Sequence, residues 1–121
     1  MNYNNDFKYD LEVGQLGEKK LADILENKKI EVKTDFQAQN TGNVFIEYKS
    51  RGKWSGIVTS TADYWCFIVS NHQFVLLSKS KTWQLARKYK DRKVRGGDDN
   101  TSVGVLVPLD ALLSHSVHEL T

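Results

Sequence analysis

Residues 29–50, KIEVKTDFQAQNTGNVFIEYKS, contain two stretches in which apolar and polar side chains alternate. The alternation in residues 29–35, and again in residues 43–50, is typical of β-strands that are apolar on one face. Between them, residues 40–43 are Asn, Thr, Gly and Asn, a composition that favours turns. We therefore predict that the two strands pair as a hairpin and turn their apolar faces toward one core.

The polar faces of the two predicted strands carry both acids and bases. A hairpin would bring two carboxylates and two ammonium groups into one patch: Glu31, Lys33, Glu47 and Lys49. Carboxylate oxygens are the ligands that Mg²⁺ prefers, and the ion usually keeps water and substrate phosphate in its other positions. A bound cation polarises the phosphorus, and a nearby lysine orients the attacking water or stabilises developing charge. Such a patch suits hydrolysis of a phosphodiester, whereas an ordinary solvated sheet face is the alternative.

Two triplets resemble the (D/E)xK signature of the PD-(D/E)xK nuclease superfamily: Glu31-Val32-Lys33 and Glu47-Tyr48-Lys49. The wider pattern EVKTD…TGNVFIEYKSRGKWSG, followed by TADYW, is similar to small phage-type members, and the resemblance covers about residues 14–68. It implies a restriction-endonuclease-like α/β fold, with a mixed β-sheet flanked by helices. It also implies DNA as the substrate and Mg²⁺ or Mn²⁺ as the cofactor.

The superfamily usually places an Asp on one strand and (D/E)xK on the next, whereas this chain has two (D/E)xK triplets. In one assignment Glu31 takes the Asp position and the second triplet is the signature. In the other the first triplet is the signature, and Glu47 adds a carboxylate. Both assignments make Glu31 and Glu47 metal ligands, but the catalytic lysine is Lys49 in the first and Lys33 in the second. The resemblance is tightest around the first triplet, which favours Lys33.

Residues 12–27 predict a first helix, because their apolar side chains fall on one stripe at helical spacing. Glu18 lies at the border of that stripe. An acidic residue on the first helix often completes the site in the superfamily that the chain resembles. Glu18 is therefore a third candidate metal ligand, and a plain border carboxylate is the alternative.

Residues 79–95 hold eight cations and a single acid, Asp91, although the net charge of the chain is only +2. Ser78 is expected to cap a helix that runs to about residue 92. Trp83, Ala86 and Tyr89 are expected on the packing side of this helix. A run of one sign suits contact with a DNA backbone, with a solvated helix face as the alternative. The predicted DNA contacts lie here and in the glycine-rich residues 51–56: Arg51, Lys53, Arg87, Lys88, Lys90, Arg92 and Lys93.

The remaining elements follow from short patterns. Residues 65–69 and 73–77 are apolar runs around a polar turn, which predicts a second hairpin. A short helical turn is expected near residues 59–61, a loop at 94–102 and a strand at 103–107. Pro108 suits the first turn of a final helix. The single cysteine, Cys66, is expected to be a buried thiol, and His115 and His118 are expected to be surface histidines.

The composition fits one soluble globular domain spanning residues 1–121, with 40% hydrophobic and 26% charged residues. Residues 1–10 are polar and are expected to form a flexible arm. No apolar run is long enough to cross a membrane, and no secretory signal is visible. The predicted location is therefore intracellular, in the cytoplasm, or in the host cytoplasm if the protein is phage-encoded.

Together these patterns predict a metal-dependent endonuclease that cuts duplex or branched DNA. A symmetric homodimer is expected, because so small a domain has little surface for cutting both strands. No membrane and no small-molecule cofactor are expected as partners. The competing prediction is a catalytically inactive DNA-binding or accessory protein with the same fold. A third is a nuclease inhibitor or subunit that binds a protein through Trp54, Trp65 or Trp83.

Overall fold

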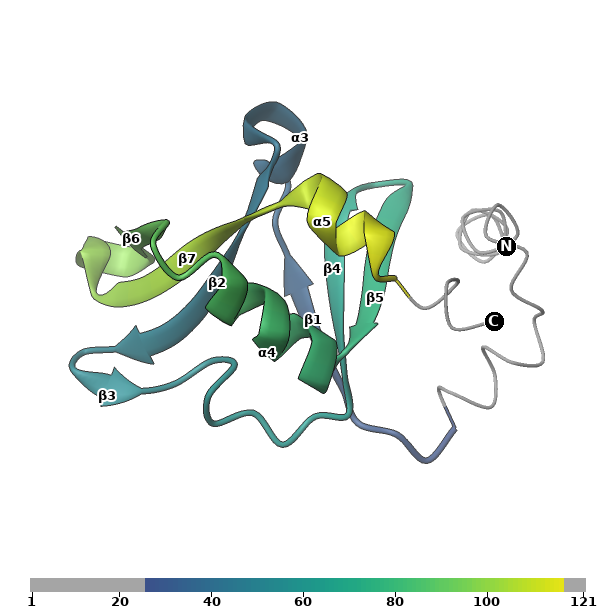
Figure 1. Cartoon of the computed structure of the whole chain (residues 1–121), viewed down its shortest axis with the longest axis horizontal. Coiled ribbons are helices and arrows are strands. Elements are labelled where there is room, and N and C mark those ends of the chain that lie inside the picture. The colour runs from purple at the N-terminus through teal and green to yellow at the C-terminus, as the bar shows by residue number, and fades with distance from the viewer. Residues whose placement is uncertain (1–25, 117–121) are drawn as a thin grey trace.

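Two β-sheets and three α-helices make up the part of the chain that the computed structural model describes, residues 26–116 (Figure 1). The first sheet has the strand order β1-β4-β5, built from β1 (Ile30–Thr34), β4 (Tyr64–Ser70) and β5 (Gln73–Ser78). It is mixed, because β1 is parallel to β4 and β5 is antiparallel to it. The predicted α/β class is confirmed, with two sheets where one was expected.

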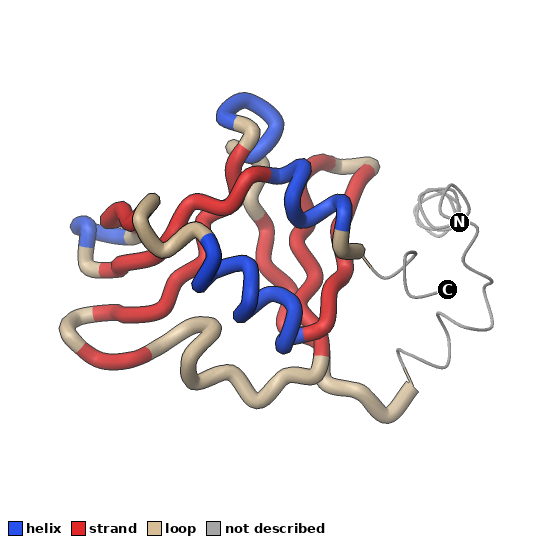
Figure 2. The backbone as a smooth tube through the Cα atoms, viewed as in Figure 1, coloured by secondary structure: helices blue, strands red, loops and turns tan. Residues whose placement is uncertain are grey.

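The second sheet is antiparallel and has the order β3-β2-β7-β6. Its strands are β2 (Asn43–Ser50), β3 (Lys53–Trp54), β6 (Lys93–Gly96) and β7 (Ser102–Pro108). The helices are α3 (Ala38–Thr41), α4 (Lys79–Lys88) and α5 (Leu109–Ser114), with a short 3₁₀ helix, η1, at Asp98–Asn100. In Figures 1 and 2, α4 and α5 lie on the same side of the strands.

The predicted hairpin of residues 29–35 with 43–50 is wrong, because β1 and β2 belong to different sheets. β1 pairs with β4, so that Lys33 lies opposite Phe67, whereas β2 pairs with β7. The predicted turn is instead the helical turn α3, which ends at Gly42 with a φ of 74° and carries the chain into the second sheet. Alternation along a strand specifies its two faces, but the partner is chosen by long-range burial.

The main core lies between the two sheets, α4 and α5. Its buried side chains come mainly from both sheets and both helices, with Ala38 of α3 and Ile57 added: Val44, Ile46, Trp65, Phe67, Val69, Val75, Leu77, Leu85, Val105, Val107 and Leu112. The alternating side chains of β1 that were expected in this core lie elsewhere. Ile30 packs on a small second cluster around Leu76, and the Val32 side chain is 54% exposed. β1 therefore turns its charged side chains, rather than its apolar ones, toward the face that carries Trp65 and Phe67.

The helix predicted after Ser78 is confirmed. The Ser78 hydroxyl accepts the Lys81 backbone N–H at 3.0 Å, which satisfies one of the donors left open at a helix start. Trp83, Ala86 and Tyr89 pack against the main core as expected. The helix ends at Lys88 rather than near residue 92.

Several other local predictions are confirmed: the hairpin of β4 with β5, the strand β7 and the helix α5 that follows Pro108. The loop expected at residues 94–102 is wrong in part, since Lys93–Gly96 pairs with β7 as β6. The helical turn expected near residues 59–61 lies earlier, where the Ser60 N–H donates to the Gly56 carbonyl at 3.0 Å. Residues 12–25 of the predicted first helix, the N-terminal arm, Glu18 and His118 lie outside the described residues, and residues 26–27, where that helix was expected to end, form a turn. No helix in residues 26–116 has the length and apolar character needed to cross a membrane.

Gly104, in the middle of β7, permits the close contact between β7 and β2. A Cβ at this position would lie 2.5 Å from the Ile46 carbonyl oxygen and 2.7 Å from the Phe45 ring. Gly104→Ala is therefore expected to lower the free energy of unfolding by about 1–3 kcal/mol. The expected fall in Tm is roughly 3–18 °C, measured by thermal unfolding followed by circular dichroism.

Gly52→Asn is the matched control. Gly52 has open space around it, and Asn tolerates its φ of 80° better than other side chains do. If Gly104→Ala unfolds at the same temperature as the unmodified protein, the inference that β7 packs too closely on β2 to admit a Cβ at this position is wrong.

Candidate functional site

A hollow of about 180 Å³ opens where the end of β1 approaches β2 and β4. We call it the charged hollow, and the residues that line it are Lys33, Thr34, Asp35, Phe45, Glu47, Trp65 and Phe67. It brings together one residue of each sequence triplet, Lys33 and Glu47, although their strands are not paired. The aromatic side chains form its apolar wall, and two carboxylates and one ammonium group supply its polar groups.

The parallel register of β1 with β4 positions Lys33. Glu31 lies opposite Trp65, and Lys33 lies opposite Phe67, so both charged side chains emerge on the face that carries the two rings. The Lys33 Nζ lies 3.4 Å from a Glu31 carboxylate oxygen and 5.7 Å from the centre of the Trp65 ring. An ion pair and a cation–π contact thus hold the ammonium group at the hollow. Glu31 does not line the hollow itself, but it adjoins it through this ion pair.

Asp35 fixes the end of β1 to the second sheet. One of its carboxylate oxygens accepts the Phe45 backbone N–H at 3.1 Å, and its own N–H donates to the Ile68 carbonyl at 2.9 Å. The sequence interpretation did not include Asp35 in the site. The sequence could have indicated it, because the alternation in residues 29–35 places Asp35 on the same strand face as Glu31 and Lys33.

Glu47 is held from the other side by the segment that follows β3. The Ser55 hydroxyl donates to a Glu47 carboxylate oxygen at 2.8 Å, and the Ile57 N–H donates to the Glu47 carbonyl at 3.0 Å. Gly56, with a φ of 54°, lies directly against the Glu47 backbone, where any Cβ would collide with it. This contact brings Ser55 close enough to orient the carboxylate.

Lys49 points elsewhere. The pairing of β2 with β7 shifts register between Glu47 and Lys49, and such a bulge interrupts the alternation of side chains. The Lys49 Nζ lies 4.8 Å from the centre of the Trp54 ring, on the paired strand β3, and Lys49 does not line the charged hollow. The structure therefore brings Lys33, and not Lys49, together with Glu47.

The charged hollow offers oxygen ligands suited to a hard divalent cation. Asp35 and Glu47 supply the carboxylates, and Mg²⁺ is commonly bound by one or two carboxylates together with water and substrate phosphate. Within residues 26–116, no group of three His, Cys, Asp or Glu side chains is arranged to hold a metal ion. A cation would therefore depend on two protein carboxylates and on the substrate.

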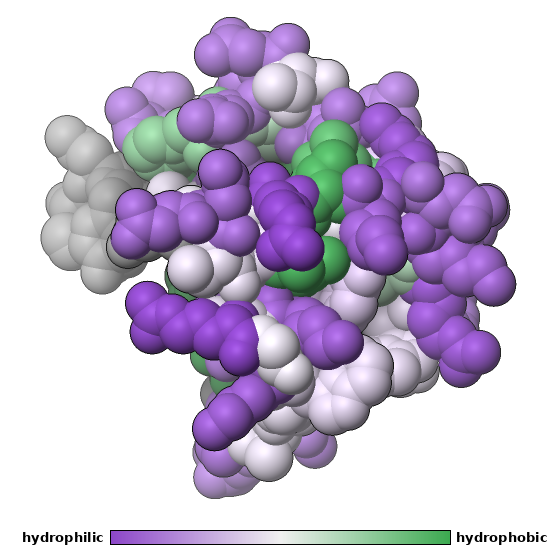
Figure 3. Space-filling model, turned by 90° about the vertical axis from the view of Figure 1, so that its left-hand side faces the viewer, coloured by the Kyte–Doolittle hydropathy of each residue, from purple (hydrophilic) through white to green (hydrophobic). Residues whose placement is uncertain are grey.

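The residues predicted to contact DNA lie on three parts of the surface. Arg51 and Lys53 are exposed at the tip of the hairpin of β2 with β3. Exposed cations also lie on or just after α4 and on β6: Arg87, Lys88, Lys90 and Lys93. The face of the molecule that carries the ends of the second sheet is largely hydrophilic (Figure 3). Arg92 differs from these residues, since it is half-buried and donates to the Asn43 side-chain oxygen at 2.9 Å.

Burial restricts what the side chains of Trp65 and Cys66 can do. Trp65 is 2% exposed, so the predicted use of Trp65 as a contact for a partner protein is wrong. Cys66 is half-buried on the face of β4 that packs on the small cluster around Leu76. Burial raises the pKa of the Cys66 thiol to about 11, so the thiol is protonated at neutral pH and is a poor nucleophile.

No protein-family model, characterised protein or solved structure matches this chain.

Replacing Asp35 tests whether its carboxylate joins the two sheets. Asp35→Ala leaves the half-buried Phe45 N–H without its acceptor, so we expect a loss of about 1–3 kcal/mol in the free energy of unfolding. Asp35→Asn keeps a side-chain oxygen and should lose less. Urea denaturation measures both values. Equal stability of Asp35→Ala and the unmodified protein would contradict this role.

Proposed function

We propose that this protein is a metal-dependent DNA endonuclease that hydrolyses phosphodiester bonds at the charged hollow, with Mg²⁺ or Mn²⁺ as its cofactor. The observation that carries the proposal is the meeting of Lys33, Asp35 and Glu47 in one hollow. Two carboxylates suit a divalent cation, and a lysine beside them can stabilise the charge that develops during phosphodiester hydrolysis. The proposal includes a restriction-endonuclease-like fold, which the mixed sheet of β1, β4 and β5 supports.

Each residue of the hollow has a separate task. Asp35 and Glu47 would hold the cation, and their hydrogen bonds to Phe45 and Ser55 fix the positions of the two carboxylates. When bound, a divalent cation supplies Lewis-acid polarisation of the phosphodiester. The Lys33 ammonium group donates hydrogen bonds to the attacking water or to the oxygen on which negative charge develops.

Glu31 acts through Lys33. Its carboxylate lies 3.4 Å from the Lys33 Nζ, so the ion pair holds the ammonium group at the hollow. This makes Glu31 a positioning residue rather than a metal ligand. The sequence interpretation assigned metal binding to Glu31 and Glu47, and this proposal replaces Glu31 with Asp35 because Asp35 lines the hollow.

The exposed cations favour DNA as the substrate, and the single charged hollow favours a dimer. The exposed cations of α4, β6 and the β2–β3 tip attract phosphates without regard to base sequence. One hollow serves one strand at a time, so a symmetric homodimer would present two hollows to a duplex. DNA is the proposed substrate and partner, and a cytoplasmic location is part of the proposal.

Removing a carboxylate should abolish cleavage without unfolding the protein. Glu47→Gln and Asp35→Asn keep the shape of each side chain but delete the charge that attracts Mg²⁺. Each is expected to lower the rate of plasmid cleavage by about 100-fold or more. The assay compares linear, supercoiled and branched DNA in Mg²⁺, in Mn²⁺ and in EDTA.

Asp110→Asn, at an exposed carboxylate on α5, is the matched control and should cleave at the normal rate. Circular dichroism spectra verify that each variant is folded. Full cleavage by Glu47→Gln, or cleavage that persists in EDTA, would refute the proposed site.

The two lysines are separated by single-turnover kinetics. Lys33→Ala should lower the cleavage rate by about 10²–10³-fold, because the ammonium group acts mainly in the transition state. Lys49→Ala should change the rate by only a few fold, because Lys49 lies against Trp54 and away from the hollow. DNA affinity measured in Ca²⁺ serves as the control for both variants. The reverse order of effects would move the catalytic role to Lys49.

One observation favours a second function, a DNA-binding accessory protein without catalytic activity. The described residues hold no preassembled set of three metal-ligating side chains. Such a protein would bind DNA equally well in EDTA and would cleave none of the substrates above.

A further inference from the structure

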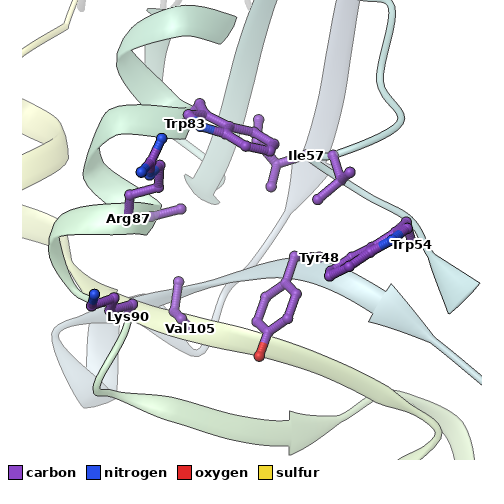
Figure 4. A pocket seen from close by; sticks show the side chains of 9 residues that line it. Tyr48, Trp54, Ile57, Trp83, Arg87, Lys90 and Val105 are labelled. Atoms are coloured by element: carbon purple, nitrogen blue, oxygen red, sulfur yellow. The ribbon is translucent and has the colours of Figure 1, made fainter. Parts of the chain in front are cut away.

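A second pocket, of about 350 Å³, lies on the other face of the second sheet (Figure 4). Val105 lines this pocket and is paired with Ile46, so both side chains lie on the same face of the sheet. Phe45 and Glu47 lie on the opposite face of β2 and line the charged hollow. The two sites are therefore separated by the sheet itself. We call the second one the aromatic pocket.

Three aromatic side chains from three different elements surround the aromatic pocket: Tyr48 on β2, Trp54 on β3 and Trp83 on α4 (Figure 4). The Tyr48 and Trp54 ring centres are 6.4 Å apart, with the planes tilted by 35°. Trp54 is 61% exposed although it is one of the largest apolar side chains of the protein. Its ring is nevertheless held in place, because Tyr48 lies beside it and the Lys49 ammonium group is 4.8 Å from its centre.

Two cations border the aromatic pocket on the side of α4. Arg87, in the last turn of α4, and Lys90, two residues beyond the end of that helix, both line the pocket. Both are exposed, and neither forms an ion pair with another residue in the range 26–116. The pocket thus combines an apolar floor and stacking surfaces with positive charge on one side.

This combination selects a ligand with a flat ring at one end and an anion at the other. Aromatic side chains stack on nucleobases of any sequence, and Arg and Lys bind phosphate. An alkyl chain with a carboxylate would also find an apolar floor and a cation, but it gains nothing from stacking on rings. The volume lies at the small end of ligand sites, which suits one nucleotide and excludes a stacked duplex.

We propose that the aromatic pocket binds one nucleoside monophosphate unit, with the base among Tyr48, Trp54 and Trp83 and the phosphate at Arg87 and Lys90. The unit is either a free nucleotide or an unpaired nucleotide of a DNA strand, since both present the same base and phosphate. This site lies apart from the charged hollow and does not require that the protein cleave DNA.

Binding is tested with the full chain in EDTA, so that no cleavage occurs and the result is independent of the nuclease proposal. Calorimetry and quenching of tryptophan fluorescence measure the affinity for dAMP, for adenosine and for decanoate. The same titrations use a single-stranded eight-residue oligo(dA) and a blunt duplex. We expect dAMP or the oligo(dA) to bind at least tenfold more tightly than adenosine, decanoate and the duplex.

Variants locate the binding. Trp54→Ala removes an exposed stacking surface and is expected to weaken binding about tenfold or more, and Arg87→Ala is expected to weaken it by several fold. Phe36→Ala removes a 51% exposed ring that does not line the pocket, and Lys81→Ala removes a cation of α4 that does not line it. Both controls should bind normally.

The two sources give different results. If dAMP binds about as tightly as the oligo(dA), the pocket is a site for a free nucleotide. Binding of the oligo(dA) without dAMP supports an unpaired nucleotide of a strand. Equal binding of adenosine, decanoate or the duplex, or an unchanged affinity in Trp54→Ala, would overturn the proposal.

Discussion

The parallel pairing of β1 with β4 is the constraint on which the candidate site depends. It places Lys33 opposite Phe67 and Glu31 opposite Trp65, on the face that the main core shares. β1 lies at the edge of the first sheet, so its ammonium and carboxylate groups reach solvent at the border of the core instead of being buried in it. Nearly half of each side chain stays exposed, so water screens the pair and its contribution to stability is small.

The second sheet meets this edge through a few specific contacts. Asp35 accepts the Phe45 N–H, and Ser55 donates to Glu47, so one hydrogen bond fixes each carboxylate of the charged hollow. The contact of Ser55 with Glu47 depends on a close backbone approach. Gly56 permits the approach of the β3 segment to Glu47, and Gly104 permits the approach of β7 to β2. Rigid placement of this kind is what a site needs in order to act on a phosphate without reorganising.

The strand β2 separates two chemically different surfaces. Glu47 faces the charged hollow, and Tyr48 faces the aromatic pocket beneath α4. The bulge between Glu47 and Lys49 directs Lys49 toward Trp54, where its charge supports the ring rather than the hollow. The proposed hydrolytic site and the proposed stacking site therefore lie on opposite faces of β2, with Arg87 and Lys90 beside the second.

The sequence alone determined the features that depend on neighbouring residues. The Ser78 cap, the β4–β5 hairpin and the strand periodicity around Glu31 and Glu47 follow from backbone geometry over a few residues, and each could be predicted. Only the tertiary structure decided that β1 pairs with β4, that Asp35 joins Lys33 and Glu47, and that Lys49 turns away. These outcomes depend on which distant apolar strands are buried together, and periodicity within a strand carries no information about its partner.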